Sequence, residues 1–191
     1  MAKILYLHGF ASSANSTKAC QLNEYIVNNT SKTNIFIPNL ENNIIDAVEQ
    51  IDNLIKESSP SSLMGSSLGG FYATYFSEKY NLQCVGINPA VIPPAEMSFY
   101  LGENKNYSTG KKFNVDQSQL DLLNQMGGEI KTIKRPNNFM ILLQSGDELL
   151  DYKAAISFYK GASVDVTFGG NHAFDKFDTY FDKIKLFLNL H

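Results

Sequence analysis

The stretch "LMGSSLGGFYATYF", Leu63 to Phe76, decides the fold class. It places Ser67 between Gly65 and Gly69, with an apolar strand-like run before it and a helix-like run after it. A serine at the tip of a sharp strand-to-helix turn needs small residues two positions away on each side, because Cβ atoms there would prevent the turn from closing. The stretch therefore predicts a nucleophile elbow. The alternative interpretation is a flexible glycine–serine loop.

Apolar runs of strand length alternate with helical patterns along most of the chain. The predicted strands are Lys3–Leu7, Asn34–Pro38, Ser61–Gly65, Leu82–Asn88, Phe139–Gln144 and Ser163–Phe168. Strand–helix alternation is typical of a parallel sheet covered on both faces. The sequence therefore predicts an α/β fold with a mostly parallel sheet of about six strands and helices on both faces.

The helices between these strands follow from apolar spacing and end signals. They are expected at Thr17–Asn28, Asn43–Glu57, Leu68–Tyr80 and Asp116–Met126, and in a C-terminal helix with Phe174, Phe177, Phe181, Ile184 and Leu188 on one stripe. The pair Gly127-Gly128 is expected to stop the fourth helix. Residues 89–136 are then a small cap insertion over one edge of the sheet, within one domain that spans 1–191.

Composition narrows the function classes. The 191 residues carry a net charge of −3, and no cluster of lysine or arginine is present, which argues against nucleic acid as a partner. The N-terminus has no apolar run and cleavage site typical of a signal peptide, and no run approaches the ~20 apolar residues of a membrane span. We therefore expect a cytoplasmic protein without a membrane span. The oligomeric state stays open.

Functional groups of an open parallel sheet gather at the carboxyl ends of its strands. The backbone N–H of Leu68 begins the helix after Ser67 and would point to a developing oxyanion. In "LHGF", directly after the first strand, the N–H of Phe10 is the candidate second donor. His8 in the same segment is expected to hold the loop rather than to act as a base.

Two further strand ends carry the candidate partners of Ser67. Asp147 follows the most apolar strand and could orient a histidine, with Asp151 and Glu148 as competitors. His172 lies in the glycine-rich "GGNHAF" segment between the last strand and the last helix. The order serine, aspartate, histidine, each on a strand-end loop, favours a catalytic triad over a surface histidine.

Other chemistries lack their motifs. No GxxxxGK[ST] or GxGxxG follows a strand, so phosphate-cradle and dinucleotide sites are not predicted. No HExxH, CxxC or close histidine–aspartate cluster offers a metal site. The sequence therefore predicts no cofactor and no metal.

The segments "LHGF", "MGSSLGGFYATYF", "LLQSGDELLDY" and "GGNHAF" together resemble the small bacterial YqiA-like esterases of the α/β-hydrolase superfamily. The resemblance runs nearly end to end and implies a compact α/β-hydrolase fold. It also implies a serine esterase that acts on short acyl esters or thioesters, small molecules, without a cofactor. In this family pattern Ser67 is the nucleophile, Asp147 the acid and His172 the base, while Phe10 and Leu68 supply the oxyanion hole.

Three questions stay open at this stage. The substrate pocket is expected to involve Phe10, Leu68 and side chains of Val91–Tyr100, but the substrate is not named by the sequence. A hydrolase-like binding protein without turnover is one alternative function. An α/β-hydrolase that cleaves a carbon–carbon or peptide bond is another, because one fold hosts many chemistries.

Overall fold

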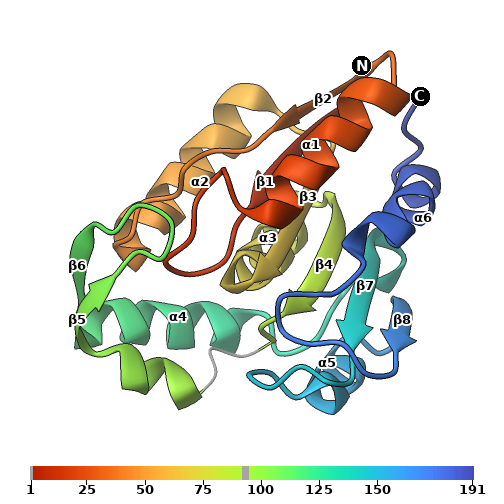
Figure 1. The fold of residues 1–191 in the computed structure, drawn as a ribbon. Helices are drawn as coiled ribbons and strands as arrows, with labels where there is room; N and C mark the ends of the chain where they lie inside the picture. The colour runs from red at the N-terminus through yellow and green to blue at the C-terminus, as the bar shows by residue number, and fades with distance from the viewer. Residues whose placement is uncertain (1, 92–94) are drawn as a thin grey trace.

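A computed structural model describes residues 2–91 and 95–191 of the chain. Within these residues a six-stranded parallel sheet has the order β2-β1-β3-β4-β7-β8 (Figure 1). The strands are β1 Ala2–Leu7, β2 Thr33–Phe36, β3 Ser62–Ser67, β4 Gln83–Pro89, β7 Phe139–Gln144 and β8 Ser163–Thr167. The predicted α/β fold is confirmed, and all strands end at one edge of the sheet, where sites in such folds lie.

Alternate residues of each strand face opposite sides of the sheet, as the pleat requires. Ile4 and Tyr6 of β1 belong to one buried cluster, and Leu5 and Leu7 belong to the other. The first face is covered by α1 Thr17–Asn29 and α6 Phe181–Phe187, and the second by α2 Ile44–Ser58, α3 Leu68–Tyr80, α4 Gln117–Glu129 and α5 Tyr152–Phe158 (Figure 1). Helices therefore cover both faces, as predicted.

The start of α2 shows how local sequence sets these boundaries. Asn43 is the N-cap, and its side-chain oxygen accepts hydrogen bonds from the N–H groups of Ile45 and Asp46. These bonds satisfy two donors that have no partner inside the helix. Ile51 and Ile55, farther along the helix, are buried on the face that packs on the sheet.

The predicted stop of the fourth helix at the glycine pair is wrong. Helix α4 continues through Gly127 and Gly128 to Glu129. The carboxylate of Glu129 accepts hydrogen bonds from Tyr75 Oη at 2.7 Å and Gln125 Nε2 at 3.3 Å. These contacts hold the last turn in place, so the weak helix propensity of glycine does not end the helix.

The C-terminal aromatic stripe is not one helix. Phe174 lies in a loop with φ of +66°, Phe177 begins the 3₁₀ helix η3 Phe177–Tyr180, and only Phe181 and Ile184 lie in α6. Leu188 is the C-cap of α6, and all five side chains of the stripe nevertheless join the buried cluster on the first face. The spacing of the apolar residues thus predicted correctly that they are buried. It did not predict that the chain turns after His172 and becomes helical only farther along.

The described residues of the predicted insertion 89–136 fall into two parts. Helix α4 is the crossover between β4 and β7, and its Leu123 packs in the core of the second face. The preceding part holds the 3₁₀ helix η1 Ala95–Tyr100 and an antiparallel hairpin, β5 Gly102–Lys105 and β6 Lys112–Val115, which the sequence did not predict. A further 3₁₀ helix, η2 Pro136–Asn138, leads into β7.

The hairpin is tied to the loop that follows β1. Asn106 Nδ2 donates to the carbonyl of Ser12 at 2.9 Å, and the Tyr107 N–H donates to the carbonyl of Ala11 at 2.8 Å. The ring of Phe10 packs edge-on against Phe113 of β6, with a centroid distance of 5.5 Å. The hairpin therefore lies beside the candidate site.

None of the helices in 2–91 and 95–191 has the length and apolarity that a membrane crossing would need.

Candidate active site

Ser67 lies at the tip of a sharp turn between β3 and α3. It is the last residue of the strand, and Leu68 is the first residue of the helix. Its backbone has φ of +55° and ψ of −126°, a conformation that L-residues with side chains rarely adopt. Such strain persists only where the surrounding structure enforces it, and it concentrates at functional sites. The predicted strand–turn–helix context of Ser67 is present.

Two glycines make this turn sterically possible. A Cβ atom on Gly65 would lie 2.1 Å from the carbonyl oxygen of Gly69. A Cβ atom on Gly69 would lie 2.1 Å from the carbonyl oxygen of Leu7, at the end of β1. Both distances are far below any van der Waals contact, and both obstacles are backbone atoms. The glycines of the elbow thus allow α3 to approach the sheet closely.

The side chains of Ser67, His172 and Asp147 lie in one hydrogen-bonded chain. His172 Nε2 lies 3.0 Å from Ser67 Oγ, and His172 Nδ1 lies 2.9 Å from Asp147 Oδ2. Because a carboxylate only accepts, Nδ1 carries the proton and Nε2 is free to accept from the serine hydroxyl. The Asp147 side chain is 2% exposed and the His172 side chain 19% exposed, so the chain of contacts is largely shielded from water.

The structure distinguishes Asp147 from its two competitors. Asp147 Oδ1 also accepts hydrogen bonds at 2.9 Å from the N–H groups of Leu149 and Leu150, which fixes the carboxylate. Asp151 is the N-cap of α5 and accepts from a backbone N–H there. Glu148 accepts from the backbone N–H of His172 at 2.9 Å, so it contacts the histidine main chain and not its ring.

The loop that carries His172 is held by two buried amides that the sequence analysis did not single out. Gln144 Oε1 accepts from the N–H groups of Asn171 and Asp175, and its Nε2 donates to the carbonyl of Asp175 at 2.7 Å. Asn88 Nδ2 donates to the carbonyl of Asn171, and its Oδ1 accepts from the Gln144 N–H. The sequence did contain a signal for Gln144, which is a polar residue at the end of an otherwise apolar strand.

The backbone amides of Phe10 and Leu68 flank Ser67. A Cβ atom on Gly9, the neighbour of Phe10, would lie 3.4 Å from Ser67 Cβ, so this loop packs directly against the elbow. Within residues 2–91 and 95–191, neither the Phe10 nor the Leu68 N–H has a hydrogen-bond acceptor. Backbone N–H groups without an acceptor at these two positions have the chemistry that an oxyanion requires.

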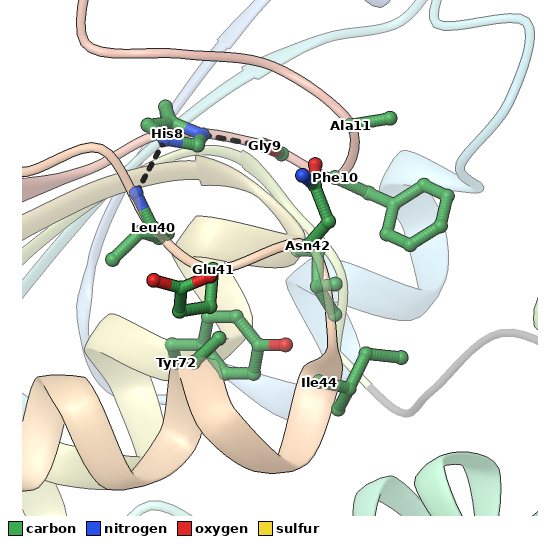
Figure 2. A pocket seen from close by; sticks show the side chains of 11 residues that line it. His8, Gly9, Phe10, Ala11, Leu40, Glu41, Asn42, Ile44 and Tyr72 are labelled. Atoms are coloured by element: carbon green, nitrogen blue, oxygen red, sulfur yellow. Dashed lines mark hydrogen bonds between the residues drawn. The ribbon is translucent and has the colours of Figure 1, made fainter. Parts of the chain in front are cut away.

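His8 holds the loop after β1 and does not contact Ser67. Its Nε2 accepts from the Leu40 N–H at 3.0 Å, and its Nδ1 donates to the carbonyl of Gly9 at 2.9 Å (Figure 2). The ring borders a cavity of about 20 Å³ that Tyr72 also lines. Burial lowers the pKa of His8, partly offset by the hydrogen bond to Gly9. The neutral ring is therefore the form that fits the fold.

This arrangement predicts a pH-dependent contribution of His8 to stability. A histidine whose pKa is lowered on folding stabilises the fold above its unfolded pKa of about 6.5, and that contribution is lost as the pH falls below it. The variant His8→Gln keeps an acceptor for Leu40 but does not titrate. We expect the wild type to lose more free energy of unfolding than His8→Gln between about pH 7.5 and the acidic range, measured by urea unfolding. Parallel pH profiles would contradict the assignment.

Two cavities meet at Ser67 and His172. The first, of about 260 Å³, is mostly apolar and lined by Phe10, Ser67, Leu68, Ala90, Met97, Tyr100, Glu148, Leu149, Leu150 and His172. The second, of about 470 Å³, is also mostly apolar but carries Lys18 and serine hydroxyls among its lining. The pocket predicted from Phe10, Leu68 and Val91–Tyr100 is thus present in part. Residues 92–94 of that stretch lie outside the described residues.

The sheet order, the crossovers and the strained turn at Ser67 define a protein of the α/β-hydrolase fold. The chain belongs to the uncharacterised protein family UPF0227, whose model matches residues 3–189. This result confirms the resemblance to the YqiA-like family. A curated relative, a UPF0227 protein of Pectobacterium atrosepticum, is 24% identical over 195 residues and covers 98% of this chain and 99% of its own length.

Solved structures show the same fold. Est1E from Butyrivibrio proteoclasticus with bound ferulic acid matches 99% of this chain and 88% of its own, with a TM-score of 0.74 and 13% identity. The esterase domain of a Rhodothermus marinus protein matches 98% of this chain and 85% of its own, with a TM-score of 0.71 and 16% identity. At these identities the similarity concerns the fold, and activity has to be argued from the residues of the site.

Proposed function

We propose that this protein is a serine esterase that hydrolyses short acyl esters or thioesters. The observation that carries the proposal is the hydrogen-bonded chain of Ser67, His172 and Asp147 at a strained strand–helix turn. Nucleophile, base and orienting carboxylate are the parts that acyl transfer through a serine requires. The esterases among the structural neighbours favour the same chemistry.

In the first half of the proposed reaction, Ser67 Oγ attacks the carbonyl carbon of the ester. His172 Nε2 takes the serine proton, and Asp147 stabilises the imidazolium that forms. The amides of Phe10 and Leu68 donate to the oxyanion of the tetrahedral intermediate. In related sites, removal of one such donor lowers kcat by about 10²–10³-fold. The carbon–oxygen or carbon–sulfur bond then breaks, and the alcohol or thiol leaves with the proton from His172.

In the second half, water replaces the leaving group beside His172. His172 Nε2 removes a proton from this water as its oxygen attacks the acyl carbon, and the same two amides bind the second oxyanion. The bond to Ser67 Oγ then breaks. The serine recovers its proton from His172, and the carboxylic acid is released. Every proton is carried by His172, so the cycle closes without a cofactor.

The cavity of about 260 Å³ suggests where the acyl chain would bind. Its lining by Phe10, Met97 and Leu150 suits a short hydrocarbon chain, because burial of apolar surface drives binding there. A panel of p-nitrophenyl esters and acyl thioesters of increasing chain length tests this class. Matched anilides and diketones test peptide and carbon–carbon cleavage in parallel. Turnover of the anilides or diketones alone would favour those alternatives, and no turnover at all would favour a binding protein.

The assignment of Asp147 as the orienting acid is tested by paired amide variants. Asp147→Asn keeps the shape of the side chain but can no longer favour the productive histidine tautomer. It should lower kcat on a p-nitrophenyl ester by about 10⁴-fold, as in a serine protease triad. Asp151→Asn should change kcat little, since asparagine caps a helix as well as aspartate does. Equal losses in the two variants would contradict the assignment.

A further inference from the structure

The two cavities that meet at Ser67 differ in charge. The cavity of about 260 Å³ includes Glu148 in its lining. The described residues that line the other cavity include Lys18, Ser12 and Ser16 and no carboxylate. A carboxylate in the lining of one cavity and an ammonium group in the lining of the other would favour different substrate groups by charge.

Lys18 is placed to bind an anion in this second cavity. It lies in the first turn of α1, is half-buried, and its Nζ donates to the carbonyl of Ala173 at 2.8 Å. That bond uses one of three N–H donors and leaves two for a ligand. Ala173 is the neighbour of His172, so the ammonium group lies next to the proposed base. The N-cap hydroxyl of Ser16 makes no capping hydrogen bond.

The carboxylates of Asp147 and Glu148, near Lys18, already accept hydrogen bonds from other groups. The Asp147 carboxylate contacts the His172 ring and two backbone N–H groups, and Glu148 accepts from the His172 main chain. Burial lowers the pKa of Lys18, and the nearby charge of Asp147 opposes this effect. Neither carboxylate lines the cavity that Lys18 lines.

We propose that the cavity lined by Lys18 binds an anionic group, a carboxylate or a phosphate, on the alcohol or thiol part of the ester, with Lys18 as its selecting residue. The inference rests on the proposed esterase function. If the cavity of about 260 Å³ holds the acyl chain, the cavity that Lys18 lines, which also borders Ser67 and His172, is open to the rest of the substrate. An anion there would form an ion pair as well as a hydrogen bond with Lys18, whereas a neutral leaving group could form only the hydrogen bond.

Three acetate esters with related leaving groups test the proposal: methyl 4-acetoxybenzoate, which is neutral, 4-acetoxybenzoate, and 4-acetoxyphenyl phosphate. Each kcat/KM is divided by the uncatalysed rate of the same ester. We expect the wild type to prefer at least one anionic ester by about tenfold or more, as a hydrogen bond to a charged group supports. The faster anionic ester distinguishes carboxylate from phosphate. Rising salt should reduce the preference.

Lys18→Met should remove this preference, and Lys18→Arg should restore much of it. Lys160→Met, an exposed lysine at the opposite end of the sheet, makes the same charge change and should keep the preference. An equal loss on neutral and anionic esters in Lys18→Met, or no anionic preference in the wild type, would overturn the inference. If none of the three esters is hydrolysed in a Ser67-dependent manner, the proposed function itself fails, and this inference fails with it.

Discussion

Replacing Ser67 by alanine should lower kcat/KM for a p-nitrophenyl ester by about four to six orders of magnitude, the range found when a triad nucleophile is removed. Alanine lacks the Oγ atom that lies 3.0 Å from His172 Nε2, so no acyl–enzyme bond can form. It keeps the Cβ atom, so the strained backbone at φ of +55° is unchanged. The thermal midpoint should therefore stay close to that of the wild type.

A matched control separates loss of chemistry from general damage. Ser157→Ala also deletes one hydroxyl, whose only recorded bond within the described residues is to the carbonyl of Lys153 at 3.0 Å on α5. It should leave ester hydrolysis at the wild-type level. If Ser67→Ala retained more than about one hundredth of the wild-type kcat, a different nucleophile or a water-based mechanism would be required.

The second large effect concerns folding. Gly69→Ala would put a Cβ atom 2.1 Å from the carbonyl oxygen of Leu7 and 2.4 Å from that of His8. Both atoms belong to the backbone of the central sheet region, so relief needs α3 or β1 to move. We expect a loss above about 4 kcal/mol, which is exceptional for one substitution. Since domains have only about 5–15 kcal/mol in total, the variant should be barely folded or insoluble.

Gly128→Ala is the control for this prediction. The added Cβ meets no atom within 4 Å, and the position lies inside α4, where alanine favours the helix. This variant should gain about 0.5–1 kcal/mol in urea unfolding. The steric account would be refuted if Gly69→Ala unfolded at the same urea concentration as the wild type, because the elbow would then have space that the structure does not provide.

The features of the fold and of the candidate site that depend on residues close together in the sequence were predictable. Gly65, Ser67 and Gly69 specify the elbow because the turn closes only without Cβ atoms on either side. The six strands are short apolar runs between helical patterns. The order of Asp147 and His172 on successive strand-end loops followed from parallel topology. Each of these inferences needs only local chemistry and the rule that parallel strands end at one edge.

Features that depend on distant contacts were not predictable in the same way. The hairpin β5–β6 consists of short, polar strands, and its Tyr107 bonds to the loop after β1, far away in sequence. Gln144 and Lys18 donate hydrogen bonds to backbone carbonyls of the His172 loop. Helix α4 runs through two glycines because Tyr75 of α3 holds its last turn. Tertiary contacts override local propensity in each case.

Covalent labelling tests the central claim most directly. A fluorophosphonate probe reacts with a serine only when a base activates its hydroxyl and an oxyanion site accepts the phosphoryl oxygen. The protein is incubated with the probe, digested, and the modified peptide is identified by mass spectrometry. The account predicts one adduct, on Ser67, with strongly slowed labelling in His172→Ala. An unlabelled wild type, or a folded Ser67→Ala variant that labels as fast as the wild type, would contradict it.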